Sequence, residues 1–235
     1  MLIKIPEIMI VLVKTIIIHN RRDFLMKAII FDLDGVICFT DKYHYIAWKK
    51  LADKHGIYFD EEINNRLRGV SRMDSLDIIL ERASKEYSAM EKEEMADEKN
   101  ATYVELLKSM STADLSDEVK QTLNELRNRG YKLAIGSSSK NTKMILGQLG
   151  LGEFFDAISD GTNITRSKPD PEVFLKAAQF LGLDPKDCLV VEDAKAGIQA
   201  AHDGGFKSAG LGEATEHPSV TYKMETFGDL LKICD

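Results

Sequence analysis

Five short aliphatic runs, separated by longer amphipathic stretches, constrain the fold of this chain more than any other feature. They are residues 28–31, 132–135, 155–158, 188–191 and, more weakly, 207–211. Continuous apolar runs bounded by polar or glycine residues are typical of strands buried on both faces of a parallel sheet. Because helical stretches alternate with these runs, the sequence predicts a doubly wound, Rossmann-like α/β core with its functional site at the carboxyl ends of the strands.

The amphipathic stretches in the second half of the chain carry signals for the start and end of helices. Ser116 is a favourable N-cap before one helix, and Gly130 follows its end. Pro171 starts a second helix, which Gly182 closes, and Asp193 precedes a third. These signals support the strand and helix alternation that the aliphatic runs predict.

Residues 41–110 interrupt this alternation, because they show only helical periodicity. The periodic apolar positions are Tyr43, Ile46, Ala47 and Leu51, then Leu76, Ile79, Leu80 and Ala83, then Met95, Thr102 and Leu106. We predict a helical cap domain over 41–110, inserted into a core domain made of 27–40 and 111–235. An insert directly after the first strand would lie over the strand ends, and Trp48 is expected in its apolar centre.

The first 26 residues differ from the rest of the chain. Residues 8–18 are almost continuously aliphatic, but this run is shorter than the roughly 20 residues that cross a bilayer as a helix. A secretory signal fits poorly, since the basic residues follow the apolar run. We predict that the functional protein begins near Met26 and that 1–26 is an extension without function. A β-strand or a membrane-surface segment is the alternative interpretation.

Charge and cysteine content narrow the class of partner. The net charge of −7 argues against nucleic acid, which needs a concentrated basic surface. The three cysteines are far apart and form no metal-ligand or CxxC pair, which indicates a reduced cytoplasmic protein. We therefore predict a monomeric cytoplasmic protein with small-molecule ligands and with no nucleic-acid or membrane partner.

The strongest chemical signal is Asp32-Leu33-Asp34-Gly35 at the end of the first strand. Two carboxylates at positions i and i+2 project to the same side, and Gly35 allows the chain to turn away tightly. An isolated DxD is often only a pair of acids at the start of a loop. Its place directly after a buried strand favours a functional pair.

Three further polar segments each follow a predicted strand. Residues 136–141 place hydroxyls and backbone amides at a strand-to-helix turn, which suits phosphate oxygens. Lys168 lies in a loop stiffened by proline, and Glu192-Asp193 ends a buried strand. A lone loop lysine is usually solvated, whereas buried carboxylates are costly unless they are paired or bind a metal.

Together these groups would form a phosphoryl-transfer site. Several carboxylates without a cysteine or histidine cluster indicate a hard cation, with Mg²⁺ as the first choice. The metal and Lys168 would screen the repulsion between an anionic phosphoryl group and Asp32, which would attack as a nucleophile and form an aspartyl-phosphate. Asp34 would exchange protons with the leaving or attacking hydroxyl.

This set resembles the haloacid dehalogenase superfamily. The motifs Asp32-x-Asp34-Gly35, Ser137, Lys168-Pro169 and Glu192-Asp193 occur in the order and spacing of that superfamily, from Lys27 to the end of the chain. The resemblance implies that Asp32, Asp34, Ser137 and Lys168 are catalytic. It also implies Mg²⁺ ligands at Asp32, Asp34 (through its carbonyl oxygen), Glu192 and Asp193, with the direct or water-mediated role of Glu192 left open.

Within the superfamily the sequence is most similar to the β-phosphoglucomutase family. The similarity rests on Thr40, Tyr43-His44, Trp48, the run from Leu67 to Leu76, Lys99-Asn100 and Ser137 to Asn141. It implies a hinge at Thr40, a phosphate grip by Arg72 and help from His44 in placing Asp34. The implied ligand-binding residues are His44, Gly69, Val70, Ser71, Arg72, Ser75, Lys99, Ser138, Ser139, Lys140 and Asn141. One departure is Phe39, where the family commonly has an acid.

The resemblance implies a Mg²⁺-dependent enzyme of carbohydrate metabolism, such as the use of maltose or trehalose. It would interconvert β-D-glucose 1-phosphate and D-glucose 6-phosphate through an aspartyl-phosphate and glucose 1,6-bisphosphate. The alternative enzyme is a phosphatase of small sugar phosphates with the same nucleophile, in which water accepts the phosphoryl group. A catalytically silent sugar-phosphate-binding protein is a third possibility, which the intact Asp32, Asp34, Lys168 and Asp193 argue against.

Overall fold

The core of the molecule is a six-stranded, fully parallel sheet, as predicted. The computed structural model describes residues 26–68 and 70–234. The strand order is β3-β2-β1-β4-β5-β6. The strands are β1 (Ala28–Phe31), β2 (Lys132–Gly136), β3 (Ala157–Ser159), β4 (Cys188–Glu192), β5 (Lys207–Gly210) and β6 (Tyr222–Lys223). The doubly wound α/β class is therefore confirmed.

The bounds of four strands differ in detail from the prediction, and one strand was not predicted. The second and fourth strands each extend one residue further, to Gly136 and Glu192. The third strand begins at Ala157, because Phe155 and Asp156 precede the pairing with β2. The fifth ends at Gly210. The edge strand β6 has only two residues and carries no aliphatic run, so its sequence gives no strand signal.

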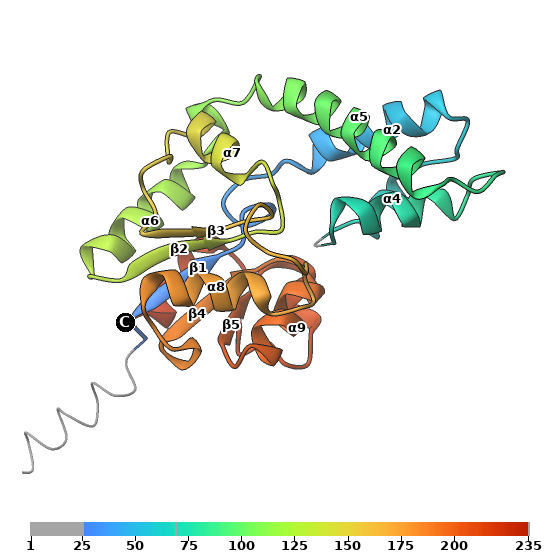
Figure 1. Ribbon diagram of the computed structural model, residues 1–235. Coiled ribbons are helices and arrows are strands. Elements are labelled where there is room, and N and C mark those ends of the chain that lie inside the picture. Colours follow the sequence, from blue (N-terminus) through green and yellow to red (C-terminus); the bar gives the residue numbers. More distant parts are fainter. Residues whose placement is uncertain (1–25, 69, 235) are drawn as a thin grey trace, which may run out of the picture.

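Helices cover both faces of the sheet, and β1 shows why its run is apolar throughout. Ile29 and Phe31 belong to a core cluster with α6 (Asp117–Asn128) and α7 (Thr142–Gln148). Ala28 and Ile30 face the opposite side, where they pack in a cluster with α8 (Glu172–Leu181) and α9 (Lys195–Asp203). Figure 1 shows these two helical layers on either side of the strands.

The predicted signals for the start and end of these helices act locally. The Ser116 hydroxyl accepts a hydrogen bond from the Val119 backbone N–H and so caps α6. Pro171 precedes α8, and Gly182 ends it in the left-handed region at φ 69°. The remaining helical turns are α10 (Leu230–Ile233) and the 3₁₀ turns Thr112–Asp114, Pro185–Asp187, Gly212–Glu216 and Phe227–Asp229.

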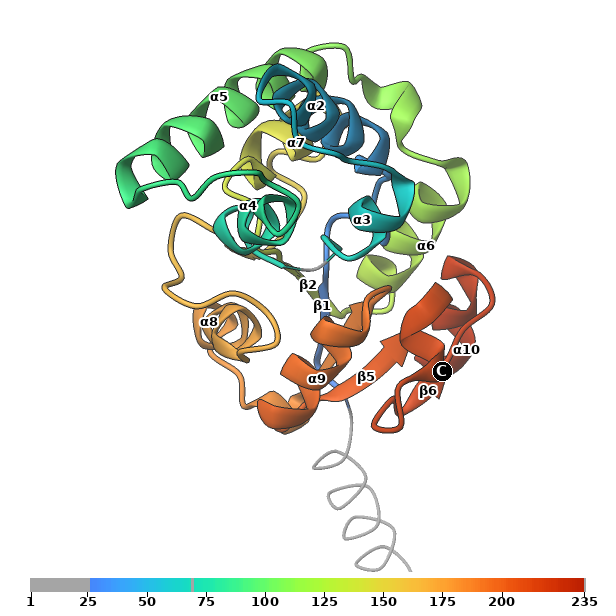
Figure 2. The same cartoon turned by 90° about the vertical axis from the view of Figure 1, so that its right-hand side faces the viewer.

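Residues 41–107 contain no strand among those that the structure describes there. They form α2 (Asp41–Lys54), α3 (Glu61–Asn65), α4 (Arg72–Leu80) and α5 (Ala89–Leu107). These helices have their own apolar cluster, with Trp48 buried at its centre as expected. We call these four helices the cap helices. Figure 2 shows them grouped beyond one end of the sheet, over the carboxyl ends of the strands.

The apolar faces of two cap helices differ from the prediction. Ile46 is about half exposed, because the buried face of α2 runs through Tyr43, Ala47 and Leu51. On α5 the buried face includes Lys99 and Tyr103 rather than Thr102 and Leu106. A helical face that buries a lysine cannot be found from apolar periodicity alone, and this lysine lies in the cavity described below.

None of the helices within 26–68 and 70–234 has both the length and the apolar character that a membrane crossing requires. The predictions for residues 1–26 concern a segment that, apart from Met26, lies outside the described residues.

Candidate active site

A cavity of about 1110 Å³ lies between the sheet and the cap helices. Both parts of the chain line it, so its two walls come from segments far apart in the sequence. The predicted site residues in its wall are Asp32, Asp34, Thr40, His44, Val70, Ser71, Arg72, Ser75, Lys99, Ser137, Ser138, Ser139, Lys140, Asn141, Lys168, Glu192 and Asp193. Gly69 lies outside the described residues. The structure thus brings together the other residues that the sequence singled out.

Asp32 and Lys168 form the centre of the core wall. Asp32 follows β1 directly, and the Lys168 ammonium group donates hydrogen bonds to Asp32 Oδ1 and Glu192 Oε1. All three side chains are buried. Burial lowers the pKa of Lys168, but the two adjacent carboxylates outweigh this effect and raise it above its ordinary value. Lys168 is therefore a permanent positive charge beside Asp32.

Glu192 is held by donors on both of its oxygens. Oε1 accepts from Lys168, while Oε2 accepts from the backbone N–H groups of Asp193 and Ala194, each at 2.9 Å. Gly197 closes the site from behind, since a Cβ there would lie 1.9 Å from Glu192 Oε1. Glu192 is thus fixed in place and orients Lys168.

Asp193 is the least compensated acid of the core wall. Burial, followed by the charges of Glu192 and Asp32, raises the pKa of Asp193 to about 8. Its carboxylate lies against Gly35, where a Cβ would be 2.0 Å from Asp193 Oδ2. Gly35 also has φ +85°, so two independent reasons require glycine in the turn after Asp34.

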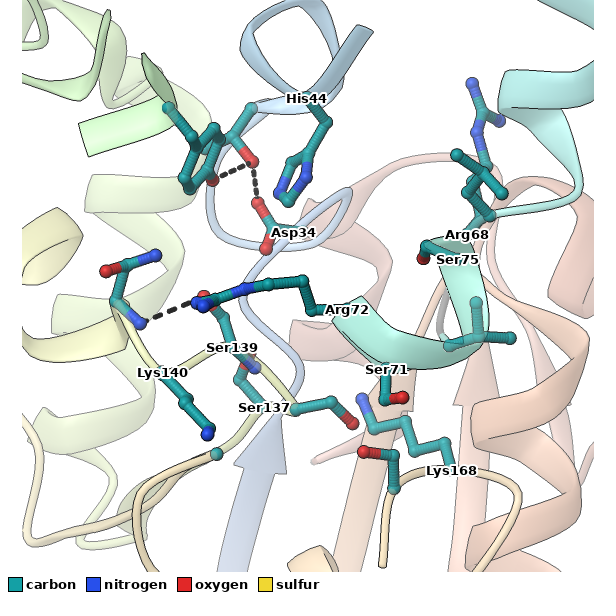
Figure 3. Close-up of a pocket in the computed structure, with 18 of the residues that line it drawn as sticks. Asp34, His44, Arg68, Ser71, Arg72, Ser75, Ser137, Ser139, Lys140 and Lys168 are labelled. Atoms are coloured by element: carbon teal, nitrogen blue, oxygen red, sulfur yellow. Dashed lines mark hydrogen bonds between the residues drawn. The ribbon is translucent and has the colours of Figure 1, made fainter. Parts of the chain in front are cut away.

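Asp34 is anchored by Thr40, the residue predicted as the hinge. Thr40 donates to Asp34 Oδ1, and the Tyr103 hydroxyl in turn donates to Thr40 Oγ1 at 3.1 Å (Figure 3). Burial and then the charge of Asp32 raise the pKa of Asp34 to about 7. A carboxyl group with this pKa can both donate and accept a proton near neutral pH.

His44 forms no hydrogen bond with Asp34 in the structure. Its Nδ1 lies 2.9 Å from Lys99 Nζ, and its ring packs at 4.1 Å between centroids against Tyr103. Lys99 Nζ also lies 4.7 Å from the ring centroid of Trp48. Burial, together with the charge of Arg72, lowers the pKa of Lys99 to about 7. His44 is uncharged here, because burial and the neighbouring Lys99 hold its pKa well below the usual range.

The loop after β2 presents hydrogen-bond donors to the cavity. Ser137 Oγ accepts from the Ser139 N–H at 3.2 Å, and Ser139 Oγ accepts from the Asn141 N–H at the same distance (Figure 3). Each hydroxyl accepts one bond from the backbone, and its own proton can still be donated to a ligand. Lys140 is exposed in the same loop. This arrangement is typical of a site for phosphate oxygens.

Arg72 reaches the cavity from the cap side. It lies at the first position of α4, and Figure 3 shows its side chain extending from that helix across the cavity. Its guanidinium donates to Asn100 Oδ1 at 2.9 Å, and Asp97 is 3.9 Å away. Burial lowers the pKa of Arg72, although a guanidinium keeps its charge at physiological pH. The cap wall therefore carries a cation for an anionic ligand.

Several residues that line the cavity were not assigned a role from the sequence. Arg68, Asn100 and Tyr103 are among them. One face of α5 carries Lys99, Asn100 and Tyr103, spaced three or four residues from each other or from the buried Ala96. Polar residues within an otherwise buried helical face were the available signal. Arg68 pairs with the exposed Asp41 at 3.0 Å and gives no such signal.

The donor set of the core wall fits a hard divalent cation. Carboxylate oxygens of Asp32, Glu192 and Asp193 lie within 4.8 Å of one another. Oxygen ligands without histidine or cysteine suit Mg²⁺ rather than a transition metal. A bound cation would also relieve the repulsion that raises the pKa of Asp193.

Comparisons with known proteins agree with this geometry. Residues 26–205 match the model of the haloacid dehalogenase-like hydrolase family. The β-phosphoglucomutase of Bacillus subtilis is 42% identical over 190 residues, which cover 80% of this chain and 84% of that protein. A fructose-1-phosphate phosphatase of Escherichia coli is 33% identical over 181 residues, covering 76% and 93%.

A solved structure is similar over nearly the same length. The crystal structure of β-phosphoglucomutase from Clostridium difficile has a TM-score of 0.83 and 38% sequence identity. The match covers 88% of this chain and 93% of that one. The similar proteins thus include a β-phosphoglucomutase and a sugar-phosphate phosphatase.

Proposed function

The chain belongs to the haloacid dehalogenase-like hydrolase family, and on that premise we propose that it interconverts β-D-glucose 1-phosphate and D-glucose 6-phosphate. The observation that carries the proposal is the presence of two anion-binding regions in one cavity. One is Asp32 with Lys168 in the core. The other pairs Arg72 of the cap with the loop of Ser139 and Asn141. A sugar bisphosphate needs both regions at once, whereas hydrolysis of a monophosphate needs only the first.

Asp32 is the group that accepts and returns the phosphoryl group. It lies at the end of a buried strand, and Lys168 neutralises part of the charge that would repel a phosphate. The Ser137 hydroxyl, at the end of the neighbouring strand, can donate to an oxygen of the transferring group. Attack by the carboxylate forms an aspartyl-phosphate, and the sugar oxygen leaves.

Asp34 moves the proton that this exchange requires. When a sugar hydroxyl attacks the aspartyl-phosphate, Asp34 accepts its proton, and in the reverse direction Asp34 protonates the leaving oxygen. The hydrogen bond from Thr40 holds Asp34 on the cap side of the turn. With a pKa of about 7, Asp34 can perform both steps at neutral pH.

Mg²⁺ is the proposed cofactor. Asp32 and Asp193 would be its side-chain ligands, and family resemblance adds the carbonyl oxygen of Asp34. Both oxygens of Glu192 already accept hydrogen bonds from the protein, which supports a water-mediated role for this residue. When bound, the cation would neutralise charge on the transferring phosphoryl oxygens.

The proposed reaction turns the intermediate around within the site. Phospho-Asp32 gives its group to the 6-hydroxyl of β-glucose 1-phosphate, and the resulting 1,6-bisphosphate reverses its orientation. Asp32 then takes the phosphoryl group from C1, and glucose 6-phosphate leaves. In each orientation the phosphate that is not transferred would lie between Arg72 and the loop of Ser139, Lys140 and Asn141. Ser71, Ser75 and Val70 would contact the sugar from the cap.

This reaction requires a cap that excludes water, because water competes with the sugar hydroxyl for the aspartyl-phosphate. We propose that residues 41–110 are this cap domain, that 27–40 and 111–235 form the core domain, and that Thr40 is the hinge. The cytoplasmic location, the monomeric state and the link to maltose or trehalose stay predictions from the sequence.

A phosphatase of small sugar phosphates is the second candidate. Its support is the 33% identity to a fructose-1-phosphate phosphatase of Escherichia coli. In that reaction Asp32 would again be the nucleophile. Water would attack the aspartyl-phosphate, and Asp34 would accept a proton from that water molecule.

The test separates the two products. Purified protein with Mg²⁺, β-glucose 1-phosphate and a trace of glucose 1,6-bisphosphate would be followed for glucose 6-phosphate and inorganic phosphate in parallel, with Asp32→Asn as the blank. We expect glucose 6-phosphate in large excess over free phosphate. If free phosphate is the main product, the phosphatase alternative is correct.

A further inference from the structure

Asn100 connects the two walls of the cavity through a single oxygen atom. Its Oδ1 accepts a hydrogen bond from Arg72 of α4 at 2.9 Å and another from Asn141 Nδ2 at 3.0 Å. Arg72 belongs to the cap helices, whereas Asn141 lies in the core, 41 residues away from Asn100 in the sequence. The amide of Asn100 therefore ties the cap to the core at the point where the two halves of the anion-binding region meet.

The side chain of Asn141 supports this interpretation independently. Asn141 is the N-cap residue of α7, a position where an asparagine side chain usually accepts a hydrogen bond from the helix backbone. No such bond forms, and the amide group donates to Asn100 instead. A favourable local contact is thus replaced by one that crosses the cavity.

The two contacts leave most donors of the anion-binding region free. A guanidinium has five N–H donors and an asparagine amide has two, and the bonds to Asn100 use one of each. Asp97, the carboxylate near Arg72, is 3.9 Å away and its side chain is 85% exposed, so it constrains the guanidinium little. Because Asn100 is uncharged, it holds Arg72 without repelling an incoming anion.

We propose that Asn100 is a positioning residue that closes the cap onto the core and holds Arg72 and Asn141 ready for a phosphate group. It does so through Oδ1, and it does not need to touch the ligand. The identity of that phosphate, the one not transferred, rests on the proposed function. The tie between cap and core does not.

A conformational experiment tests the tie without any reaction. The three native cysteines are buried, so cysteines introduced at the exposed positions Glu86 of the cap and Glu153 of the core can be labelled selectively with a dye pair. Energy transfer in the ligand-free protein would be compared for Asn100→Ala, Asn100→Asp and the control Asn124→Ala. Asn124 is exposed on α6 and is not among the residues that line the cavity.

We expect the distribution of cap-to-core separations to broaden in Asn100→Ala. The distribution in Asn100→Asp should match that of the unsubstituted protein, because aspartate keeps the acceptor oxygens. The control Asn124→Ala should also match it. Alanine favours the helix interior, so loss of folding is not the expected cause of a change in Asn100→Ala. If Asn100→Ala gives the same distribution as Asn124→Ala, Asn100 does not join the cap to the core and the proposal is wrong.

Steady-state kinetics with β-glucose 1-phosphate give a second readout. Asn100→Ala should raise KM about tenfold and change kcat less, because the donors for the phosphate are no longer held in place. Asn100→Asp should raise KM more, about 100-fold, through repulsion of the phosphate by the added charge. A KM of Asn100→Ala equal to that of the control would contradict the role in phosphate binding. If the unsubstituted protein forms no glucose 6-phosphate, the proposed function fails, and the energy-transfer result still decides whether the tie exists.

Discussion

The two walls of the cavity carry opposite kinds of electrostatic imbalance. On the core wall the pKa values of acids are raised, to about 7 for Asp34 and about 8 for Asp193, chiefly by burial and then by other acids. On the cap wall the pKa values of bases are lowered, to about 7 for Lys99, chiefly by burial and then by Arg72. Each wall therefore concentrates charge of one sign in a place where water screens it poorly.

This difference indicates the charge of the ligand that each wall would bind. A cluster of buried acids is relieved by a cation, and buried bases are relieved by an anion. The core wall also contains its own counter-charge at Lys168, whereas Arg72 and Lys99 have no carboxylate within 3.5 Å among the described residues. Lys168 thus compensates part of the charge of the core wall without a ligand, whereas the charges of the cap wall depend on a bound phosphate.

The largest effect should come from removing the nucleophile of the core wall. Asp32→Asn replaces the attacking oxygen with an amide, and we expect both glucose 6-phosphate formation and phosphate release to fall by roughly 10⁴-fold or more. Binding at the cap wall should persist, which isothermal titration with glucose 6-phosphate can measure. Thermal unfolding of the variant controls for folding. Turnover within tenfold of the unsubstituted protein would exclude Asp32 as the nucleophile.

Removal of Mg²⁺ should be the next largest effect, because it leaves the acids of the core wall uncompensated. We expect chelation to lower the rate by about 10³-fold. It should also lower the melting temperature by a few degrees, since the cation binds the folded protein. Asp193→Asn should remove most of this thermal response. Asp203→Asn, at an exposed position of α9, is the matched control and should keep it. An equal response of the two variants would place the cation elsewhere.

Removal of the Arg72 guanidinium from the cap wall should affect substrate binding more than the chemical step. Arg72→Ala is expected to raise KM for β-glucose 1-phosphate about 100-fold and to increase the fraction of product released as free phosphate. Arg82→Ala, at an exposed position in the turn between α4 and α5, is the control and should have neither effect. If the ratio of phosphate to glucose 6-phosphate is unchanged in Arg72→Ala, Arg72 binds the second phosphate but does not help to exclude water.

The same contrast between the walls explains how much could be predicted from the sequence. The core wall was found from local position, because Asp32, Ser137 and Glu192 each stand at the end of a buried strand. Parallel strands bring their carboxyl ends to one edge, so no contact between distant residues had to be known. The class of the fold followed from the same aliphatic runs, and only the short edge strand β6 was missed.

The cap wall could not be derived in this way. Helical periodicity located α2 and α5 but misplaced the buried face of α5, since Lys99 and Tyr103 point inward. The roles of Arg72 and Lys99 were predicted only by family resemblance. The contact of Asn100 with Asn141 joins residues 41 apart in the sequence, and neither neighbourhood signals it. A wall formed by closing one part of the chain onto another leaves no local pattern.

The smallest predicted effect is a pH dependence that arises from Lys99. Its pKa is lowered from 10.5 to about 7 in the folded protein, where His44, Arg72 and the more distant Asp34 surround it. The folded protein therefore loses this proton near pH 7, while the unfolded chain keeps it to above pH 10. Between these limits the unfolded chain binds more protons, so the contribution of Lys99 to the free energy of unfolding increases with pH.

Binding should change in the opposite direction, which distinguishes the cap wall from a purely structural region. Protonated Lys99 attracts the sugar phosphate, so kcat/KM should fall by about tenfold from pH 6.5 to pH 8.5 as the proton is lost. Lys99→Arg keeps its charge over this range, and the ratio of the two pH profiles cancels the titration of the phosphate itself. The ratio should be flat below pH 6.5 and rise in favour of Lys99→Arg above pH 7. A flat ratio throughout would mean that the charge of Lys99 does not serve binding, and that the anion-binding character of the cap wall rests on Arg72 alone.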